Sequence, residues 1–370
     1  MKIIHVMMRE KFTTGMVKFF NDYFDNGEHK IVYCNTIGEK SLIDPECKIE
    51  QVDIYREDNM YLIKSLEKME CDYIILHNLF FLTNPEKLNI LLNRKIRKKL
   101  VWVEWGADLY SWKSFGGIKT KLLNMLNYLF RRELKHIIFI FPPDEDFYKR
   151  KFKNSKAKCY YAPYLIYPLS KEYDKYVSES RLAVDKIQGN PIYIQIGHNG
   201  MPTLNHKRVL KELSKYGNEN INILLPLSYG GTKEYVDAVA KYANKLFPGK
   251  TTILRDFMPA DEYYRLLKKV SIVIFDTHRQ CALGNIHLMN FRNVKLYLSA
   301  ECVMYNYFLE QGVPVEKYEN IKDMSFEEFI ACPQMVNKDK FRSYIDSISH
   351  IDFGKNCWEN IFEELRFEMQ

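Results

Sequence analysis

Short apolar runs separated by helical stretches mark the first half of the chain. The runs predict strands over residues 3–7, 30–34, 73–76, 100–105 and 136–141. Between the first two strands, residues 13–24 carry apolar side chains at helical spacing and predict a helix. Strands that alternate with helices are typical of a mostly parallel sheet covered on both faces.

The alternation is interrupted near the middle of the chain and then restarts. Residues 160–170 contain Pro163, Pro168 and several tyrosines and lead into a polar helical segment at 171–186, which we interpret as a linker. Beyond it the pattern predicts strands at 192–196, 221–226, 251–254, 271–275 and near 301–305, with helices at about 204–216, 232–246, 260–269 and 285–298. The end of the chain, about 324–367, has a helical and aromatic pattern.

The fold class that follows is α/β, with two Rossmann-like domains that we expect to face each other across a cleft. The first domain is expected at 1–165 and the second at 170–325, and helices over 326–370 are expected to return to the first domain. A length of 370 residues suits two domains of this size. Open α/β sheets bind ligands beyond the carboxyl ends of their strands, so two such domains provide two half-sites.

Composition narrows the class of partner. Hydrophobic residues make up 46% of the chain and charged residues 27%, which is ordinary for a globular protein and argues against disorder. A net charge of +7 suits an anionic partner such as a nucleotide diphosphate, a lipid diphosphate or an acidic membrane surface. The dense basic stripe of a nucleic-acid binder is missing from the sequence, so we expect no nucleic-acid partner.

The cysteines and the N-terminal residues bear on the compartment. The eight cysteines form no CxxC pair and are irregularly spaced, which predicts neither a zinc site nor a disulfide framework. Unpaired cysteines suit a reducing compartment. Apolar runs fall short of the roughly 18–20 residues that cross a bilayer, and charges come too early in residues 1–10 for a signal peptide. We therefore expect a cytoplasmic protein.

Three candidate catalytic residues lie at the ends of predicted strands in the first domain. Asp108 follows the strand at 100–105 and a turn at Gly106, where a general base is expected; capping of the next helix explains the same residue equally well. His77 follows the strand at 73–76, where it can orient an acceptor hydroxyl or bind a phosphate. A hydrogen-bonded structural histidine is the other interpretation of this residue. Glu104 is the third candidate, unless its side chain points into the sheet.

Three loops of the second domain carry small, polar or basic residues directly after strands. Gly197 and Gly200 let the backbone approach a ligand, and the helix that follows offers free N–H groups to a phosphate. Arg279 can neutralise a diphosphate. The candidate binding residues are Gly197, His198, Asn199, Gly200, Ser228, Tyr229, Gly230, Arg279, Gln280, Gly284 and Asn285. Their pattern is neither a Walker loop nor GxGxxG, so no nicotinamide cofactor is expected.

Two features of the first domain bear on a membrane. Residues 93–99 form a basic cluster, and residues 119–135 predict a helix with apolar side chains on one side and Lys or Arg at both ends. The apolar positions are Leu122, Leu126, Leu129 and Phe130. A basic amphipathic helix can lie on an anionic bilayer. Ordinary core packing with a solvated basic rim explains the same pattern, so both interpretations stay open.

The motifs and their order along the chain resemble those of a known family, the bacterial TDP-N-acetylfucosamine:lipid II N-acetylfucosaminyltransferases. Members of this family are GT-B-like glycosyltransferases of enterobacterial common antigen assembly. The run Trp105-Gly-Ala-Asp-Leu-Tyr110 is the specific part of the resemblance. The other matching positions are His5, His77, Gly197, Gly200, Asn205-His206, Pro226, Tyr229, Glu234-Tyr235, Arg279-Gln280 and Leu283-Gly284. The chain departs from the family pattern at His198-Asn199 and Cys281-Ala282, which leaves the identity of the donor open.

The resemblance implies a reaction, a donor and an acceptor. A deoxy-amino sugar, such as 4-acetamido-4,6-dideoxygalactose, or a fucose-like sugar would pass from a dTDP-sugar to a polyprenyl-diphosphate-linked saccharide. The pathway would be common antigen, O-antigen or capsule assembly, at the inner face of the bacterial cytoplasmic membrane. The nucleotide sugar is a substrate, and neither a cofactor nor a metal is expected, because GT-B enzymes can offset the leaving-group charge with helix N-termini and basic side chains.

Other interpretations of the same patterns remain. Asp144-Glu-Asp146 matches the DxD pattern that holds a metal in the other major glycosyltransferase class, but it follows two prolines and favours the first turn of a helix. A nucleotide-sugar epimerase of the same fold would act on the donor without an acceptor. A two-lobed solute-binding protein would share the architecture, but such proteins are normally exported.

Overall fold

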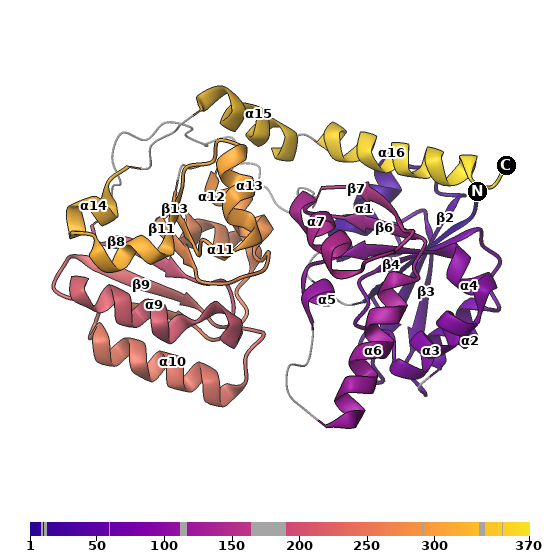
Figure 1. Ribbon diagram of the computed structural model, residues 1–370, viewed down its shortest axis with the longest axis horizontal. Helices are drawn as coiled ribbons and strands as arrows, with labels where there is room; N and C mark the ends of the chain where they lie inside the picture. The colour runs from indigo at the N-terminus through magenta and orange to yellow at the C-terminus, as the bar shows by residue number, and fades with distance from the viewer. Residues whose placement is uncertain are drawn as a thin grey trace. The chain divides into compact units, whose positions relative to one another are not determined.

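The computed structural model describes residues 1–8, 10, 13–58, 60–111, 117–163, 190–290, 292, 294–332, 337–349 and 351–370. It divides into two compact units (Figure 1), unit 1 with Met1–Tyr167 and His350–Gln370, and unit 2 with Pro168–Ser349. The expected linker helix at 171–186 lies outside the described residues. Within the described ranges no helix is both long and apolar enough to span a membrane.

Unit 1 is built on a seven-stranded sheet in which every neighbouring pair is parallel, with the order β3-β2-β1-β4-β5-β6-β7. The strands are β1 (Ile3–Met8), β2 (His29–Asn35), β3 (Glu50–Tyr55), β4 (Tyr73–His77), β5 (Leu100–Glu104), β6 (His136–Phe139) and β7 (Lys158–Tyr161). The helices are α1 (Thr13–Tyr23), α2 (Tyr61–Leu66), α3 (Asn84–Leu92), α4 (Arg94–Lys99), α5 (Ala107–Tyr110), α6 (Ile118–Arg132), α7 (Pro142–Lys151) and α16 (Ile351–Phe367). The sequence pattern did not predict β3 and β7, which lie at the two edges of the sheet and therefore lack a long apolar run.

Alternate residues of each strand contact opposite layers of unit 1. Ile4 and Val6 belong to the core beneath α2, α3, α6 and α7. The other face, which includes His5, contacts Phe20 of α1 at 4.3 Å between ring centroids. Trp358 of α16 packs on the same Phe20 at 5.0 Å, so the C-terminal helix completes this second layer.

Unit 2 contains a six-stranded parallel sheet with the order β10-β9-β8-β11-β12-β13. The strands are β8 (Ile192–Ile196), β9 (Ile221–Pro226), β10 (Thr251–Leu254), β11 (Val270–Phe275), β12 (Lys295–Leu298) and β13 (Val315–Lys317). The helices are η1 (Pro202–Leu204), α9 (His206–Leu213), η2 (Ser214–Tyr216), α10 (Lys233–Leu246), α11 (Ala260–Leu267), α12 (Leu283–Asn290), α13 (Val303–Glu310), η3 (Tyr318–Asp323), α14 (Phe326–Ile330) and α15 (Lys338–Ser349). The helical tail therefore divides, with α14 and α15 in unit 2 and α16 in unit 1.

Two predicted elements of unit 2 are wrong. The helix expected at 285–298 ends at Asn290, and the end of the expected range, Lys295–Leu298, forms the buried strand β12 instead. The strand expected near 301–305 is instead the start of helix α13. Lys295, the first residue of β12, accounts for the wrong prediction. Its side chain is 1% exposed, and its ammonium pairs with the Glu316 carboxylate at 3.1 Å. A buried lysine breaks the apolar pattern by which a strand is recognised in the sequence.

Both sheets contain a point at which the strand order reverses. The chain adds strands outward from β1 to β3 and then returns to place β4 beside β1, and unit 2 repeats this with β8 and β11. At such switch points the loops after the two central strands diverge and leave a crevice, which is where open α/β sheets bind ligands. The predicted α/β class is confirmed, and its two switch points direct attention to the loops after β1, β4, β8 and β11.

Candidate functional site

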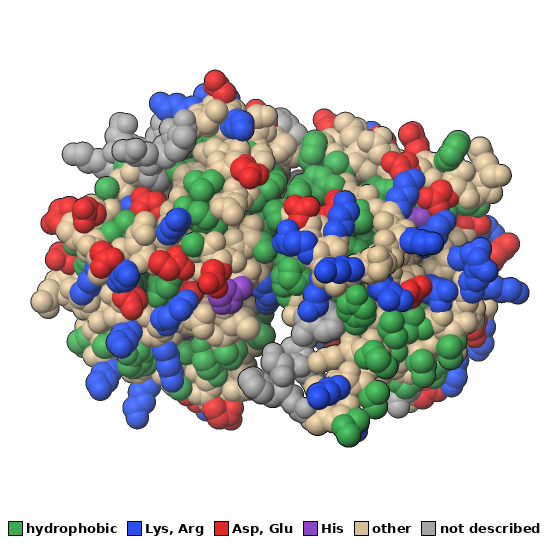
Figure 2. Space-filling model, viewed as in Figure 1, with side chains coloured by type: hydrophobic (Ala, Val, Ile, Leu, Met, Phe, Trp, Pro, Cys, Tyr) green, Lys and Arg blue, Asp and Glu red, His purple; other side chains and the backbone are tan. Residues whose placement is uncertain are grey.

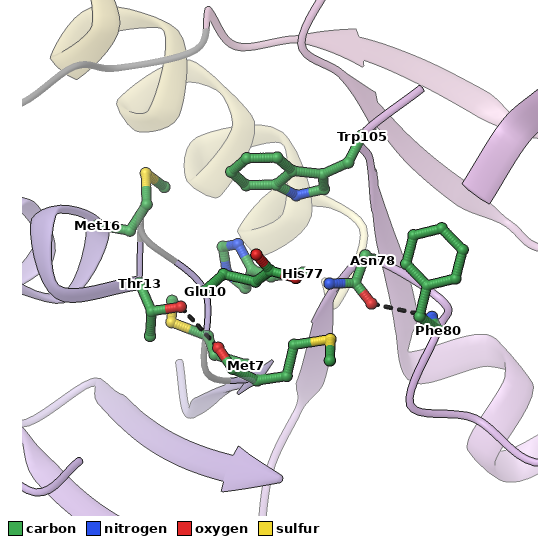
Figure 3. Close-up of a pocket in the computed structure, with 9 residues that line it drawn as sticks. Met7, Glu10, Thr13, Met16, His77, Asn78, Phe80 and Trp105 are labelled. Atoms are coloured by element: carbon green, nitrogen blue, oxygen red, sulfur yellow. Dashed lines mark hydrogen bonds between the residues drawn. The ribbon is translucent and has the colours of Figure 1, made fainter. Parts of the chain in front are cut away.

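The switch point of unit 1 holds a pocket of about 180 Å³ (Figure 3). The pocket is lined by Met7, Met8, Glu10, Thr13, Met16, His77, Asn78, Phe80 and Trp105. These residues come from the ends of β1, β4 and β5 and from the start of α1. Most of the lining is apolar or aromatic, with the His77 imidazole and the Glu10 carboxylate as its titratable groups.

The turn after β4 shapes one wall of this pocket. Asn78 has a φ of +93°, a left-handed conformation that bends the chain sharply away from the strand. Its Oδ1 accepts a hydrogen bond from the backbone N–H of Phe80 at 2.9 Å. The turn leaves the Phe80 ring 53% exposed at the pocket. Trp105, at the end of β5, contributes a second aromatic side chain to the same pocket (Figure 3).

His77 is the predicted catalytic residue that the structure places in the pocket. It is only 4% exposed, and its Nε2 lies 3.0 Å from Nδ1 of His5. Its Nδ1 is buried and has no hydrogen-bond partner among the described residues. Burial lowers the pKa of His77 to about 3, so the ring is neutral at physiological pH.

Asp108 lies beneath the pocket and does not line it. Its carboxylate accepts hydrogen bonds from the Trp102 indole at 2.7 Å, from the N–H of Trp105 at 2.9 Å and from the N–H of Leu79 at 3.1 Å. The side chain is 1% exposed, and burial raises its pKa. These bonds join the turn after β4 to the turn after β5. Asp108 therefore positions the two loops that carry His77 and Trp105.

Glu104 is also fully buried and accepts a hydrogen bond from the N–H of Gly106. Burial, followed by the nearby Asp144 and Asp108 carboxylates, raises the pKa of Glu104 well above its usual range. Asp144 is in the first turn of α7, as expected for an acidic residue there, and accepts a bond from the Tyr110 hydroxyl at 2.7 Å. Among the described residues no group of three or more His, Cys, Asp or Glu side chains is arranged to hold a metal ion.

The glycines of the second domain join two loops to each other. The N–H of Gly200 donates to the carbonyl of Tyr229 at 2.7 Å. A Cβ on Gly231 would lie 2.1 Å from the Gly200 oxygen, and one on Gly197 would lie 2.9 Å from Nε2 of His206. The structure thus brings the predicted 197–200 and 228–230 loops together. It also gives these glycines a packing role that is independent of any ligand.

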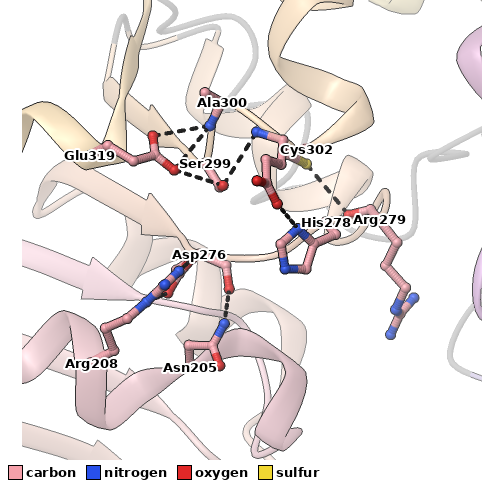
Figure 4. A network of polar contacts seen from close by, with 10 residues as sticks. Asn205, Arg208, Asp276, His278, Arg279, Ser299, Ala300, Cys302 and Glu319 are labelled. Atoms are coloured by element: carbon pink, nitrogen blue, oxygen red, sulfur yellow. Dashed lines mark hydrogen bonds and ion pairs between the residues drawn. The ribbon is translucent and has the colours of Figure 1, made fainter. Parts of the chain in front are cut away.

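The loops after β8 and β11 meet at the switch point of unit 2. The His198 and Phe275 rings lie 5.9 Å apart, and the Asn205 amide donates to the carbonyl of Asp276 at 3.1 Å. Arg208 binds the Asp276 carboxylate through two nitrogens (Figure 4). After β12, Glu319 accepts bonds from the Ser299 hydroxyl at 2.8 Å and the Ala300 N–H at 3.1 Å.

Arg279 differs from Arg208, which is paired with Asp276. Its guanidinium points away from the other residues that Figure 4 labels and donates a hydrogen bond of 3.3 Å to the carbonyl of Gln280. Gly284 is in the first turn of α12, and Asn285 donates to the Tyr263 hydroxyl at 2.8 Å. The side chain of Asn199 bonds the N–H of Met201, and Ser228 is half-buried in the turn with Tyr229.

Sequence reasoning missed several polar residues at this end of the unit 2 sheet. They are Arg208, Asp276, Ser299 and Glu319. Asp276 directly follows a correctly predicted strand, so its position was the available signal. Ser299 follows β12, which the sequence pattern did not reveal, and Glu319 reaches it from η3.

Comparison with known families decides what kind of protein has these two switch-point sites. Residues 1–352 match the model of the 4-alpha-L-fucosyltransferases, glycosyl transferase group 56. The chain belongs to this family. It is therefore a glycosyltransferase, and the family resemblance carried by the Trp105–Tyr110 run is confirmed.

Solved structures with the same fold are glycosyltransferases of low sequence identity. The alpha,alpha-trehalose 6-phosphate synthase of Burkholderia multivorans is 9% identical, with a TM-score of 0.68 over 100% of this chain and 97% of its own. The UDP-forming enzyme of Burkholderia vietnamiensis is 10% identical, with a TM-score of 0.67 over 99% and 100%. The Anabaena protein HepE, solved with UDP and glucose, is 11% identical, with a TM-score of 0.63 over 98% and 100%. These likenesses establish the GT-B fold.

Proposed function

We propose that the enzyme moves a deoxy-amino or fucose-like sugar from a nucleotide donor, with dTDP-sugars favoured, to a polyprenyl-diphosphate-linked saccharide of surface polysaccharide assembly. The observation that carries the proposal is the contrast between the two switch points of a fucosyltransferase-family chain. Unit 1 offers a small aromatic pocket with neutral His77, and unit 2 offers loops with the cation Arg279. The first suits a sugar hydroxyl and the second suits a diphosphate.

The donor half of the proposal rests on the loops of unit 2. Arg279 extends from the loop after β11, directly before α12, whose first turn includes Gly284. A guanidinium and a helix N-terminus are the groups that bind a diphosphate and stabilise the charge it gains as the sugar leaves. The likeness to HepE, which was solved with UDP and glucose, supports a nucleotide sugar as the ligand. We propose that these groups act in place of a metal ion.

The acceptor half rests on the pocket of unit 1. About 180 Å³ is below the 300–1,000 Å³ typical of sites for drug-sized ligands, and it suits one sugar unit of a longer acceptor. Trp105 and Phe80 provide aromatic surfaces for the sugar ring. We propose His77 as the base that receives the acceptor proton, with Asp108 as a positioning residue, because Asp108 is buried beneath the pocket with three N–H donors on its carboxylate.

An anionic membrane is the proposed surface partner of unit 1. Ile118, Leu122 and Met125 follow one another at helical spacing on α6 and are 78%, 56% and 54% exposed. Leu92, on the adjoining helix α3, is 79% exposed. Helix α4 supplies basic side chains and has no buried residue, and Figure 2 shows hydrophobic and basic side chains together on this side of unit 1. Of the stripe expected from the sequence, Phe130 packs in the core and Leu122 does not.

Vesicle sedimentation tests the membrane proposal. Vesicles with about one third phosphatidylglycerol should bind the protein, and neutral phosphatidylcholine vesicles should not. The double variant Ile118→Ser/Leu122→Ser should lose most of the binding, while Leu309→Ser, which changes a 41% exposed residue of unit 2, should retain it. Equal binding of the wild type and the double variant would refute this surface.

A nucleotide panel followed by a transfer assay tests the reaction. dTDP, UDP, GDP and CMP are compared by thermal shift with magnesium or with EDTA, because a ligand of the folded state raises the melting temperature. We expect dTDP to stabilise the protein in EDTA, and its sugar nucleotide to label a polyprenyl-diphosphate saccharide. Conversion of the donor without an acceptor would indicate an epimerase. Silence towards all four nucleotides would refute the donor site.

A further inference from the structure

Three histidines form a diagonal line across the centre of the unit 1 sheet. In the parallel register, Ile3 lies beside His29, and His5 lies beside Ile75. His29, His5 and His77 are therefore each displaced by two residues on neighbouring strands β2, β1 and β4. A displacement of two keeps all three side chains on the same face of the sheet. The line ends at the pocket, which His77 borders.

The three rings are joined through their nitrogens. Nδ1 of His29 lies 2.9 Å from Nε2 of His5, and Nδ1 of His5 lies 3.0 Å from Nε2 of His77. All three residues are at most 4% exposed. A neutral imidazole has one N–H and one acceptor nitrogen, so His5 must donate to one neighbour and accept from the other. Both hydrogen bonds therefore run in the same sense, and the tautomer of His77 is tied to that of His29.

The surroundings of the line differ between its two ends. At the His29 end, Glu28 binds the N-terminal amine and Arg366, and Asp25 adds a further negative charge that acts on His29. The middle is packed against Phe20 and Phe362, which are apolar. At the pocket end, Nδ1 of His77 is buried and unbonded within the described part of the chain. A buried polar atom without a partner costs about 1–3 kcal/mol, a cost that a bound hydroxyl would remove.

We propose that His29 and His5 act as positioning residues that hold His77 with Nδ1 unprotonated and share the proton that it receives. The proposal rests on the function proposed above. The acceptor oxygen bonds to the sugar carbon as the bond from that carbon to the nucleotide diphosphate breaks, and the diphosphate leaves with the electron pair. The acceptor O–H bond breaks, and its proton bonds to Nδ1 of His77. The Nε2 proton of His77 then moves to Nδ1 of His5, and the Nε2 proton of His5 moves to Nδ1 of His29. The positive charge is thereby placed beside Glu28, and the reverse movement returns the proton to water after the product leaves.

Nitrogen-15 NMR of the full chain with labelled histidines tests the tie between the rings without any substrate. Two-bond proton–nitrogen correlations distinguish Nδ1–H from Nε2–H, and single-histidine variants assign the signals. We expect Nε2–H at both His5 and His77 in the wild type. His29→Phe should produce a mixture of tautomers at His77. Nδ1–H at His77, or a His77 tautomer that His29→Phe leaves unchanged, would overturn the proposal.

Kinetics test the role of the line in turnover. His29→Phe should lower kcat about 10- to 100-fold, change KM for the acceptor less than twofold, and move the acid limb of the kcat–pH profile to lower pH. The matched control is His136→Phe, because His136 lies in the same sheet row as His5 and is equally buried but bonds Tyr160 instead. It should keep kcat within twofold. If His29→Phe changed the tautomer of His77 but left kcat unaltered, the proton-sharing role would be refuted and the proposed transfer reaction would stand. If the wild type showed no transfer, only the proposed reaction would be refuted.

Discussion

The two switch points share a topology and differ in chemistry. In unit 1 the loops after β1 and β4 surround a pocket of methionine and aromatic side chains around a neutral histidine. In unit 2 the loops after β8 and β11 carry glycines, an arginine–aspartate pair and a second arginine, Arg279. Strand order therefore determines where a ligand site forms, and the loop residues determine which ligand it suits.

Under the proposed function, this contrast gives the two units separable tasks. A neutral, apolar pocket lowers the cost of removing water around a hydroxyl that loses its proton. A cationic loop at a helix N-terminus binds an anion whether or not any chemistry follows. A change in one site should therefore alter catalysis and leave nucleotide binding unaffected, and a change in the other should do the opposite.

The largest effect is expected at His77. His77→Gln should reduce kcat by about 100- to 10,000-fold, because general base catalysis contributes a factor of this size. The Kd for the nucleotide, measured by calorimetry, should change less than twofold. His136→Gln, which alters another fully buried histidine of the same sheet, serves as the control. Retention of a tenth or more of wild-type kcat in His77→Gln would show that another group removes the proton.

The next effect concerns the loops that carry the pocket. Asp108→Asn replaces an acceptor of three N–H donors with an amide whose own N–H atoms face them. We expect a loss of about 3 kcal/mol in the free energy of unfolding, as for other broken buried networks. The measurement is urea unfolding followed by tryptophan fluorescence, because all four tryptophans belong to unit 1. Unchanged stability together with complete loss of kcat would instead identify Asp108 as the base.

Arg279 provides the reciprocal test in unit 2. Arg279→Ala should weaken dTDP binding about 10- to 100-fold, since hydrogen bonds to charged groups contribute about 1.5–3 kcal/mol each. Lys241→Ala on the exposed side of α10 removes the same charge away from the loops and should leave the Kd unchanged. Equal losses in the two variants would mean that only net charge matters. The kcat at saturating donor then shows whether Arg279 also acts on the leaving group.

Sequence patterns predicted the sheets better than the contacts of the site. The central strands are buried on both faces and read as apolar runs, so β1, β4, β5, β8 and β9 were found. Position after a strand then selected His77, Asp108 and Arg279. The sequence alone did not show which residues of neighbouring strands share a face of the sheet. Only the register places His5 between His29 and His77.

The same limit explains the opposite outcomes at Asp108 and His77. His77 is the last residue of β4, and Asp108 comes shortly after the end of β5, in the first turn of α5. The turn at Gly106, with a φ of +77°, directs the Asp108 carboxylate back under β5 and toward Trp102. The direction of a side chain that depends on one turn dihedral cannot be predicted from the distance to the preceding strand. Of two residues near strand ends, one can therefore line a pocket while the other lies beneath it.

The smallest effect that we expect is a dependence of unit 1 stability on pH. Burial lowers the pKa of His77 to about 3 and that of His29 to about 4, from 6.5 in the unfolded chain. Between these values the unfolded state binds more protons, so the free energy of unfolding falls as the pH falls. Each of the two histidines should remove about 2 kcal/mol between pH 6.5 and 5. Glu104 and Asp108 have the opposite sign, because burial raises their pKa values and the folded state then gains stability as the pH falls, which offsets part of the drop in the wild type.

Urea unfolding at pH 6.5 and pH 5, again followed by tryptophan fluorescence, measures this dependence. His29→Phe should make the drop about 2 kcal/mol smaller than in the wild type, because one neutral buried imidazole is gone. His278→Phe changes an exposed histidine of unit 2 and should leave the drop as it is. If the drop were the same in the wild type and in His29→Phe, His29 would already carry a proton in the folded state. The three histidines would then carry a positive charge before the reaction begins. His77 could not pass the acceptor proton on to His5 and His29, because that transfer requires both neighbours to be neutral.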